Sequence, residues 1–290
     1  MYKIIAFLGI PILQKSCGQL INTIVCIDKC ADKCYNFTRY ISCEIYCTDI
    51  RTNVHRRLIF IDCGLYYEEK GDGFPLIFLH GNGENHEYFI HQTEFFSHYY
   101  RVITPDTRGH GKSPRGDGAF TLKRFAEDLH DFMTALGIQK AHISGFSDGG
   151  NIALYFALKY PFMIEKLVLN GANISPQGVK RKVQIPIEIG YRIALRHADK
   201  SAKAKINAEM LALMVNEPDI SVDDLNKIRI PTLVIAGTRD MIKRTHTELI
   251  TKSIPGAELK FIKGNHFVAN KNYNAFNNAV YNFLCKQHSE

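Results

Sequence analysis

Long apolar runs and runs of basic residues are both missing from this 290-residue sequence. No apolar stretch reaches the roughly 18 residues that a helix needs to cross a bilayer. The net charge of +7 is spread along the chain. No cluster of lysine and arginine is interleaved with aromatic residues, as a groove for single-stranded nucleic acid would require. The sequence therefore predicts neither a membrane span nor a nucleic-acid partner.

A clear small-x-small cleavage site is also missing after the N-terminal segment, in which Lys3 is followed by ten mostly apolar residues. Such a site would mark a secretory signal peptide. We therefore favour an apolar strand or helix in an unusual leader, and a cytoplasmic protein, over secretion through a signal-like segment.

C-x-x-C pairs, which zinc ribbons commonly use, do not occur either. Seven of the eight cysteines nevertheless fall within the first 63 residues, and several are spaced i, i+4, so that on a helix they would line one face. A metal or disulfide cluster is one interpretation. We favour an extension over residues 1–57 that carries incidental thiols in a reducing compartment. The seven are Cys17, Cys26, Cys30, Cys34, Cys43, Cys47 and Cys63.

From about residue 58 the sequence alternates between short apolar runs and segments of helical periodicity. Strands that alternate with helices pair in parallel through right-handed crossovers. The pattern predicts one α/β domain over 58–290, with a mostly parallel central sheet and helices on both faces. Strands are expected at 58–63, 65–69, 75–80, 101–106, 141–146, 166–171, 232–237 and 257–264, and helices at 86–97, 122–137, 149–159, 243–252 and 271–286.

The alternation stops between about 173 and 227, where the interior looks helical. An insertion there would lie above the carboxyl edge of the sheet, where such folds bind ligands. Its many basic residues could steer anionic substrates, although we prefer a solvated helix face. They are Lys180, Arg181, Lys182, Arg192, Arg196, Lys200, Lys203 and Lys205, against Glu188 and Asp199. We expect its apolar residues Ile185, Ile187, Ile189, Leu211, Leu213 and Met214 to line a pocket or pack on the core.

The stretch SGFSDGG (144–150) places three glycines around one serine, between an expected strand and an expected helix. Gly145 and Gly149 suit a sharp bend with no room for side chains. The stretch fits the G-x-S-x-G nucleophile elbow, which exposes its serine, here Ser147, at the apex of the turn. Free N–H groups at the start of the following helix would favour a developing negative charge. The alternative is a plain glycine turn.

A serine hydroxyl is a weak nucleophile and needs a base to take its proton. Asp240 follows the strand at 232–237, and His266 follows the strand at 257–264, in the order expected for this architecture. Because parallel strands end at one sheet edge, we expect these side chains to meet Ser147. The alternatives are a helix N-cap for Asp240 and a solvent-exposed loop position for His266.

The turn HGNGEN (80–85) follows the apolar strand at 75–80. Its small residues would let the backbone turn an N–H group toward the nucleophile. We expect the N–H groups of Asn82 and Asp148 to form an oxyanion hole, in which each donor contributes roughly 2.7–4 kcal/mol to the transition state. A turn that only ends the strand is the alternative.

Five segments together resemble the α/β-hydrolase superfamily, of the esterase and C–C hydrolase type. They are LIFLHGNGEN, DTRGHGKS (106–113), GFSDGG, AGTRD and GNHF, in that order. The resemblance implies an α/β-hydrolase fold with a helical lid, a catalytic triad of Ser147, Asp240 and His266, and no metal or organic cofactor. It also implies that the DTRGHGKS loop braces the site. The first 57 residues match nothing in the family.

The residues and the resemblance together favour a serine hydrolase that cleaves a small to medium carboxylic ester through an acyl-enzyme on Ser147. One alternative keeps the triad and cleaves an amide, or a carbon–carbon bond beside a ketone. Another is a ligand-binding protein that retains the scaffold without catalysis. The expected partner is a small-molecule ester or ketone. Haloalkane and epoxide hydrolases are disfavoured, because their nucleophile is an aspartate.

Overall fold

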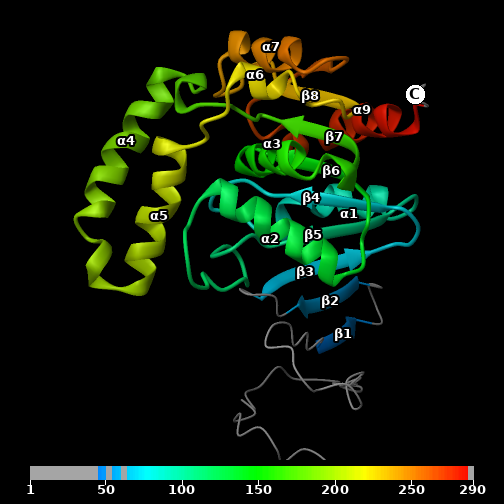
Figure 1. Ribbon diagram of the computed structural model, residues 1–290, viewed down its shortest axis with the longest axis horizontal. Helices are drawn as coiled ribbons and strands as arrows, with labels where there is room; N and C mark the ends of the chain where they lie inside the picture. The colour runs from blue at the N-terminus through cyan, green and yellow to red at the C-terminus, as the bar shows by residue number, and fades with distance from the viewer. Residues whose placement is uncertain (1–44, 50–53, 60–63, 287–290) are drawn as a thin grey trace, which may run out of the picture.

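The computed structural model describes residues 45–49, 54–59 and 64–286, and for the first two ranges it describes the backbone only (Figure 1). The strands in these ranges form a single sheet in the order β1-β2-β3-β5-β4-β6-β7-β8-β9. They are β1 (Ile45–Asp49), β2 (Val54–Ile59), β3 (Leu65–Lys70), β4 (Pro75–Leu79), β5 (Arg101–Pro105), β6 (Ala141–Phe146), β7 (Ile164–Asn170), β8 (Thr232–Gly237) and β9 (Glu258–Ile262).

The sheet is parallel from β5 to β9, as the alternation of strands and helices predicts. Antiparallel pairing is confined to the N-terminal strands, where β1 pairs with β2, β2 with β3, and β3 with β5. The carboxyl ends of the parallel strands therefore lie at one edge, and the loops that follow β4, β6, β8 and β9 emerge there together. The predicted mostly parallel sheet is confirmed.

Helices cover both faces of the sheet, because successive strand residues point to opposite sides. In β4, Ile77 and Leu79 join the core that packs against α2 and α3, whereas Leu76 and Phe78 join the core that packs against α1 and α9. The helices outside the insertion are α1 (Ile90–Phe96), α2 (Leu122–Ala135), α3 (Asp148–Lys159), α6 (Val222–Leu225), α7 (Arg244–Ser253), α8 (Val268–Lys271) and α9 (Tyr273–Cys285).

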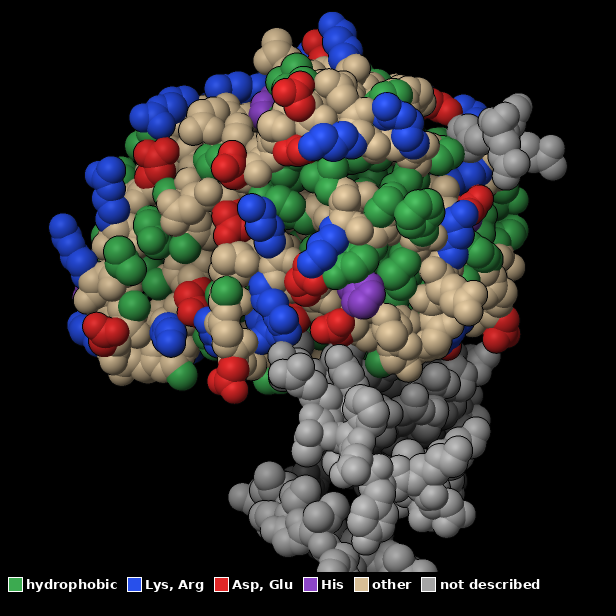
Figure 2. Space-filling view, viewed as in Figure 1, with side chains coloured by type: hydrophobic (Ala, Val, Ile, Leu, Met, Phe, Trp, Pro, Cys, Tyr) green, Lys and Arg blue, Asp and Glu red, His purple; other side chains and the backbone are tan. Residues whose placement is uncertain are grey.

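The helical insertion consists of α4 (Arg181–Leu195) and α5 (Ala202–Asn216), which pack against each other at one side of the molecule (Figure 1). Leu213 is buried, as expected, but Ile185 and Ile189 are 40% and 52% exposed, because the face of α4 that carries them turns away from the core. Lysine and arginine side chains are spread along the outer edge of this pair, among acidic and hydrophobic ones (Figure 2).

The strands differ from expectation mainly near the N-terminus. β2 begins at Val54, four residues before the strand expected at 58–63, and residues 60–63 lie outside the described residues. β1 falls within the segment that we assigned to an extension, yet its backbone pairs with β2. The boundary between residues 57 and 58 stays a prediction. The N-terminal segment with signal-like character lies outside the described residues.

The helix expected at 122–137 ends as its sequence indicates. Gly137 has a φ of 67°, a left-handed conformation that glycine adopts without strain. The helix expected at 271–286 is confirmed as α9, which runs from Tyr273 to Cys285, and the short α8, which ends at Lys271, precedes it. Among the described residues, no helix has both the length and the apolar character needed to cross a membrane.

Candidate active site

Ser147 stands at a sharp turn between β6 and α3. Its φ of 52° and ψ of −120° are unusual for a residue with a side chain, and its N–H donates to the Asn170 carbonyl at the end of β7 (2.8 Å). A Cβ at Gly145 would collide with the backbone of Gly149, and one at Gly149 would collide with the backbone of Leu79. The two glycines are therefore required for so close a turn.

The structure brings the side chains of Ser147, Asp240 and His266 together. His266 Nε2 lies 3.0 Å from Ser147 Oγ, and His266 Nδ1 lies 2.7 Å from Asp240 Oδ1. Asp240 can only accept when ionised, so Nδ1 carries the proton and Nε2 is left to accept from the serine hydroxyl. The three residues lie on the loops after β6, β8 and β9, which the parallel topology places at one sheet edge.

Both alternatives for the acid and the histidine fail. His266 is only 5% exposed, which does not fit a solvent-exposed loop histidine. Its ring lies against Gly171, where a Cβ would approach His266 Cε1 to 2.7 Å. The N-cap of α7 is Lys243, so Asp240 does not cap that helix. The three side chains thus have positions that neither capping nor solvent exposure explains.

Asp240 is held as a carboxylate by its hydrogen-bond donors. Burial alone would raise its pKa, but the hydrogen bond and charge of His266 lower it, and so do the N–H groups of Ile242 and Gly237. These two N–H groups donate to Oδ1 and Oδ2 at 3.0 and 3.1 Å. The pKa of Asp240 therefore lies below its ordinary value, and the group stays ionised beside the imidazole.

The turn after β4 lies directly against this site. A Cβ at Gly81 would come within 3.2 Å of Ser147 Cβ, so the backbone there approaches the elbow closely. Asp148 is the first residue of α3, and its N–H is therefore one of the donors at a helix start that have no acceptor within the helix. The placement of Asn82 and Asp148 beside Ser147 is compatible with the expected oxyanion donors, whose role stays a prediction.

The side chain of Asn82 was not assigned a role from the sequence. Its Nδ2 donates to Asp148 Oδ2 (2.9 Å) and to the Met210 carbonyl of α5 (2.9 Å). Both amide hydrogens are thus used, one on the elbow and one on the insertion. Burial raises the pKa of Asp148, while the amides of Asn82 and Asn151 and the nearby His266 partly counteract that rise.

His80 is a second residue to which the sequence analysis gave no role. The N–H of Thr107 donates to His80 Nε2 (2.9 Å), so the proton of this ring is on Nδ1, which donates to the Gly81 carbonyl (2.8 Å). Burial and the neighbouring His110 lower the pKa of His80 to about 4. The ring is therefore neutral at ordinary pH. The one feature of the sequence that could have pointed to His80 was its position at the end of an apolar strand.

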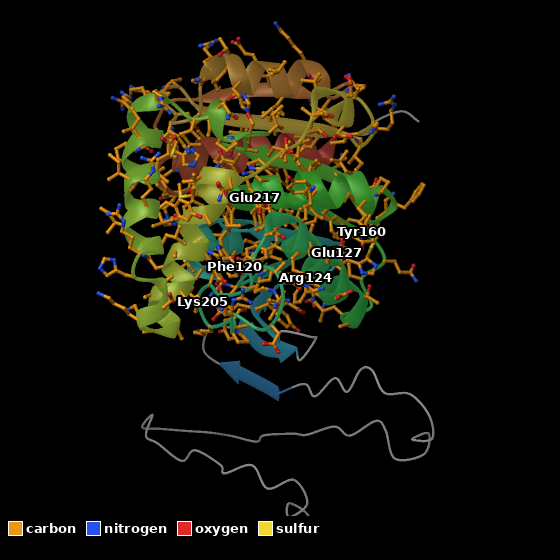
Figure 3. All side chains as sticks on the ribbon, turned by 60° about the vertical axis from the view of Figure 1, so that its left-hand side comes forward. Phe120, Arg124, Glu127, Tyr160, Lys205 and Glu217 are labelled. Atoms are coloured by element: carbon orange, nitrogen blue, oxygen red, sulfur yellow. The ribbon has the colours of Figure 1, made fainter. Side chains whose placement is uncertain are left out.

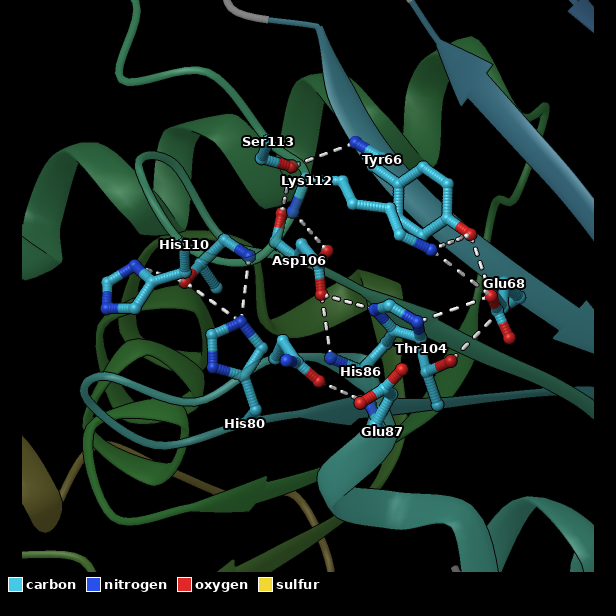
Figure 4. Close-up of polar contacts among 12 residues, drawn as sticks. Tyr66, Glu68, His80, His86, Glu87, Thr104, Asp106, His110, Lys112 and Ser113 are labelled. Atoms are coloured by element: carbon cyan, nitrogen blue, oxygen red, sulfur yellow. Dashed lines mark hydrogen bonds and ion pairs between the residues drawn. The ribbon is translucent and has the colours of Figure 1, made fainter. Parts of the chain in front are cut away.

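A buried polar cluster surrounds His86, directly after the turn that follows β4 (Figure 4). Asp106 accepts from the His86 N–H (2.7 Å), from His86 Nδ1 (2.8 Å) and from the Lys112 N–H (2.8 Å). His86 Nε2 also lies 3.2 Å from Glu68. Burial alone would lower the pKa of His86, but its hydrogen bonds to the two carboxylates raise it to about 9. His86 is therefore a charged group inside the fold.

The loop with Asp106, Arg108 and His110 makes contacts of the bracing kind that the resemblance implies. Arg108 forms a buried bidentate ion pair with Asp128 of α2, in which both hydrogen bonds are 2.7 Å long. His110 Nδ1 lies 3.1 Å from the Thr107 hydroxyl, which also contacts His80. These contacts connect the loop to α2 and to the turn that follows β4.

No group of three or more His, Cys, Asp or Glu side chains within the described residues is arranged to hold a metal ion. The N-terminal cysteines, for which a metal or disulfide cluster is the less favoured interpretation, fall largely outside this part of the chain. Six of the seven lie outside the described residues, and for Cys47 only the backbone is described. Cys285, near the C-terminal end of α9, is a free thiol.

Comparisons with known proteins agree on one scaffold. A family model described as alpha/beta hydrolase fold matches residues 75–210. The human serine hydrolase BPHL is 27% identical over 245 residues, which cover 76% of this chain and 82% of its own. The 2-hydroxymuconate semialdehyde hydrolase of Pseudomonas putida is 30% identical over 200 residues, covering 68% of this chain and 63% of its own. A solved hydrolase structure from Pseudomonas aeruginosa matches with a TM-score of 0.67 at 25% identity, covering 84% of this chain and 98% of its own.

Proposed function

The chain belongs to the alpha/beta hydrolase fold family, and from this premise we propose that it is a serine hydrolase that cleaves a small to medium carboxylic ester. One observation carries the proposal. A serine on a strained turn is in contact with a histidine, and that histidine is in contact with a buried carboxylate, at 3.0 and 2.7 Å. Such a chain of contacts is how an enzyme turns a hydroxyl into a nucleophile.

The first half of the reaction forms an acyl-enzyme. His266 Nε2 takes the proton of Ser147 as its Oγ attacks the ester carbonyl carbon, and Asp240 stabilises the resulting imidazolium. The carbonyl oxygen becomes negative and accepts hydrogen bonds from the N–H groups of Asn82 and Asp148. His266 then gives its proton to the leaving alcohol oxygen, and the acyl group stays on Ser147.

The second half releases the acid. Water takes the place of the alcohol, His266 removes a proton from it, and the hydroxide formed attacks the acyl carbon. The same N–H groups hold the oxyanion again, and the proton returns to Ser147 Oγ when the ester bond breaks. No metal or organic cofactor has a part in these steps.

A fluorophosphonate probe tests the nucleophile directly. We expect the probe to label the wild-type protein and the Ser147→Ala variant to remain unlabelled, with ester hydrolysis reduced at least about a thousandfold. Circular dichroism of both proteins controls for folding. A folded wild-type protein that takes up no label and hydrolyses no ester would contradict the proposal and favour the ligand-binding alternative.

A carbon–carbon hydrolase is the second candidate, because the Pseudomonas putida relative is a 2-hydroxymuconate semialdehyde hydrolase. The same nucleophile, base and oxyanion donors would serve that chemistry at a ketone carbonyl. A panel of p-nitrophenyl esters of increasing chain length, run beside a vinylogous diketone, separates the two reactions. Ester cleavage should dominate; a higher kcat/KM for the diketone would reassign the reaction.

A further inference from the structure

A cavity of about 250 Å³ adjoins the proposed catalytic histidine on the side of the acid loop. Three segments form its wall: the start of α4, the loop after β8 and the loop after β9. His266 and Asp240 belong to the lining, together with Lys180, Lys182 and Arg239. Whatever occupies this cavity therefore lies next to the group that exchanges protons with the substrate.

The basic residues are held in place by backbone contacts. The N–H of Lys180 donates to the Met241 carbonyl (2.8 Å), and the preceding Val179 forms a β-bridge with Ile242. The N–H of Arg239 donates to the Gly264 carbonyl (2.8 Å). The start of the insertion is thus joined to the acid loop, and the acid loop is joined to the histidine loop.

The free polar side-chain groups around the cavity are donors. Asp240 supplies the one carboxylate of the lining, and both its oxygens already accept hydrogen bonds. Lys182 and Arg239 make no side-chain hydrogen bond or ion pair with any part of the chain that the structure describes. Asn265 Oδ1 accepts from the Phe267 N–H (3.1 Å), which leaves the Asn265 amide hydrogens to donate.

Nothing nearby on the insertion neutralises these cations. Lys180 Nζ donates to the backbone carbonyl of Asp240, not to a carboxylate. The first turn of α4 contains no acidic residue. Arg181, which does have an ion-pair partner in Glu188, is not part of the lining. The cavity therefore carries an excess of positive charge, and an anionic group is the complement to that charge.

The same cavity also has an apolar part, formed by Val183, Met241 and Phe267. An inorganic anion would leave these side chains without contact, whereas an organic carboxylate would use both parts of the wall. His266 delivers a proton to the leaving oxygen in the reaction proposed above. The lining includes His266 but not Ser147, to which the acyl group is attached, so a group in this cavity is assigned to the alcohol portion of the ester.

We propose that this cavity is a subsite for a carboxylate carried by the leaving-group side of the substrate. The inference rests on the proposed ester hydrolysis and narrows its substrate class to esters of hydroxy acids. Lys182 and Arg239 are the specificity-determining residues. Two of the basic residues of the insertion, Lys180 and Lys182, thus have a local role beyond that of a solvated helix face.

Three butyrate esters test the subsite. Phenyl butyrate is neutral, 3-carboxyphenyl butyrate carries a carboxylate on the leaving group, and 3-carbamoylphenyl butyrate has nearly the same shape without the charge. We expect kcat/KM for the carboxylated ester to exceed that for the carbamoyl ester at least about tenfold at low salt, as charge-assisted hydrogen bonds allow. At 1 M salt, where the screening length is about 3 Å, the ratio should fall markedly.

Paired variants locate the effect. In Lys182→Gln/Arg239→Gln the preference for the carboxylated ester should shrink about tenfold. Lys203→Gln/Lys205→Gln removes the same charge from α5, whose Lys205 is labelled in Figure 3, and should keep the wild-type ratio. A wild-type ratio near one, or equal losses in both double variants, would overturn the subsite.

Product binding separates this inference from the hydrolase proposal. Calorimetry on Ser147→Ala should detect 3-hydroxybenzoate binding at least about tenfold tighter than 3-hydroxybenzamide, and Lys182→Gln/Arg239→Gln in the same background should remove that difference. Hydrolysis of all three esters at similar rates, with no binding difference, refutes the subsite alone. Tight 3-hydroxybenzoate binding to a wild-type protein that hydrolyses none of them refutes the proposed reaction and retains the subsite.

Discussion

The imidazole of His80 orients a peptide group that we propose as part of the oxyanion hole. Its Nδ1 donates to the Gly81 carbonyl, and the same peptide unit carries the N–H of Asn82. Because a trans peptide is planar, its C=O and N–H point in opposite directions. Holding the carbonyl on one side therefore directs the N–H to the other. His80 is a positioning residue in this arrangement, acting through the backbone.

Replacing His80 by Phe should separate this role from simple burial. We expect His80→Phe to lower kcat about 10- to 100-fold with little change in KM, because the donor matters most when charge develops on the substrate oxygen. His142→Phe is a matched control, since His142 is another buried histidine whose pKa lies at about 4, mainly through burial. Steady-state kinetics on one ester provide the measurement. Equal effects of the two substitutions would argue against orientation.

At the scale of elements, α5 is joined to the body of the fold at its middle and just after its end. Arg115 forms a bidentate ion pair with Glu209 (2.7 and 3.0 Å), and Asn82 donates to the Met210 carbonyl. Glu217, which follows α5 and is labelled in Figure 3, accepts from the Leu122 N–H at the start of α2 (2.8 Å). These contacts hold the insertion against the α/β body of the fold.

Removing one of these contacts should loosen the insertion. In Glu209→Gln we expect α5 amides to exchange hydrogen about three- to tenfold faster, because a partly buried bidentate pair contributes roughly 1 kcal/mol. Glu188→Gln removes an ion pair on the exposed surface of α4 and should leave that exchange rate unchanged. Hydrogen exchange followed by mass spectrometry gives both rates. Similar protection in all three proteins would show that the ion pair does not anchor α5.

Elements differ in how far the sequence predicts them. The strands that precede Ser147, Asp240 and His266 are short and bounded by turns, and the expected ranges agree closely with β6, β8 and β9. The order of the strands was not predictable, because β5 lies between β3 and β4 and such pairing depends on contacts distant in sequence. The polar cluster around His86 was not predictable either, since its partners Glu68 and Asp106 lie in other parts of the fold.

For the whole molecule, buried titratable groups set how stability depends on pH. His80 and His142 have pKa values of about 4, so between pH 4 and 6.5 the unfolded chain binds two protons that the folded chain does not. Burial raises the pKa of Glu84 to about 7. Above about pH 4.5 the folded chain therefore keeps a proton on Glu84 that the unfolded chain releases, and this proton offsets one of the two histidine protons. His86, with a pKa of about 9, is protonated in the folded chain between pH 6.5 and 9, whereas its side chain is neutral in the unfolded chain over that range.

These differences predict a stability maximum near pH 6.5. Below it the free energy of unfolding should fall as pH decreases. Above it the folded chain binds a proton at His86 that the unfolded chain has released, so the free energy of unfolding should fall by up to about 3 kcal/mol by pH 9. Urea unfolding at pH 5, 6.5 and 9 measures the profile. In His86→Gln, which cannot be protonated, the alkaline decline should be smaller. Wild-type stability that rises from pH 6.5 to 9 would contradict this assignment.

Truncation tests the extent of the catalytic unit. We propose that residues 58–290 form it, and we expect a chain starting at Arg57 to keep kcat/KM within about twofold. Such a chain loses β1 and the first half of β2, so Glu68 and Glu69 of β3 lose their partners in β2 and lie at an open edge. A chain starting at Ile45 retains both strands and is the control. Aggregation or loss of rate in the shorter chain alone would move the boundary before β1.

The backbone of Ser147 has a consequence for how sequence change at this position would be tolerated. A φ of 52° with a ψ of −120° is unfavourable for every residue that has a Cβ and comfortable for glycine. Local conformational preference therefore opposes the hydroxyl that we propose as nucleophile. If only stability were selected, glycine would be favoured at position 147, although it has no hydroxyl and could not react. Serine at this position therefore lowers the stability of the fold and is retained only where its reactivity is selected.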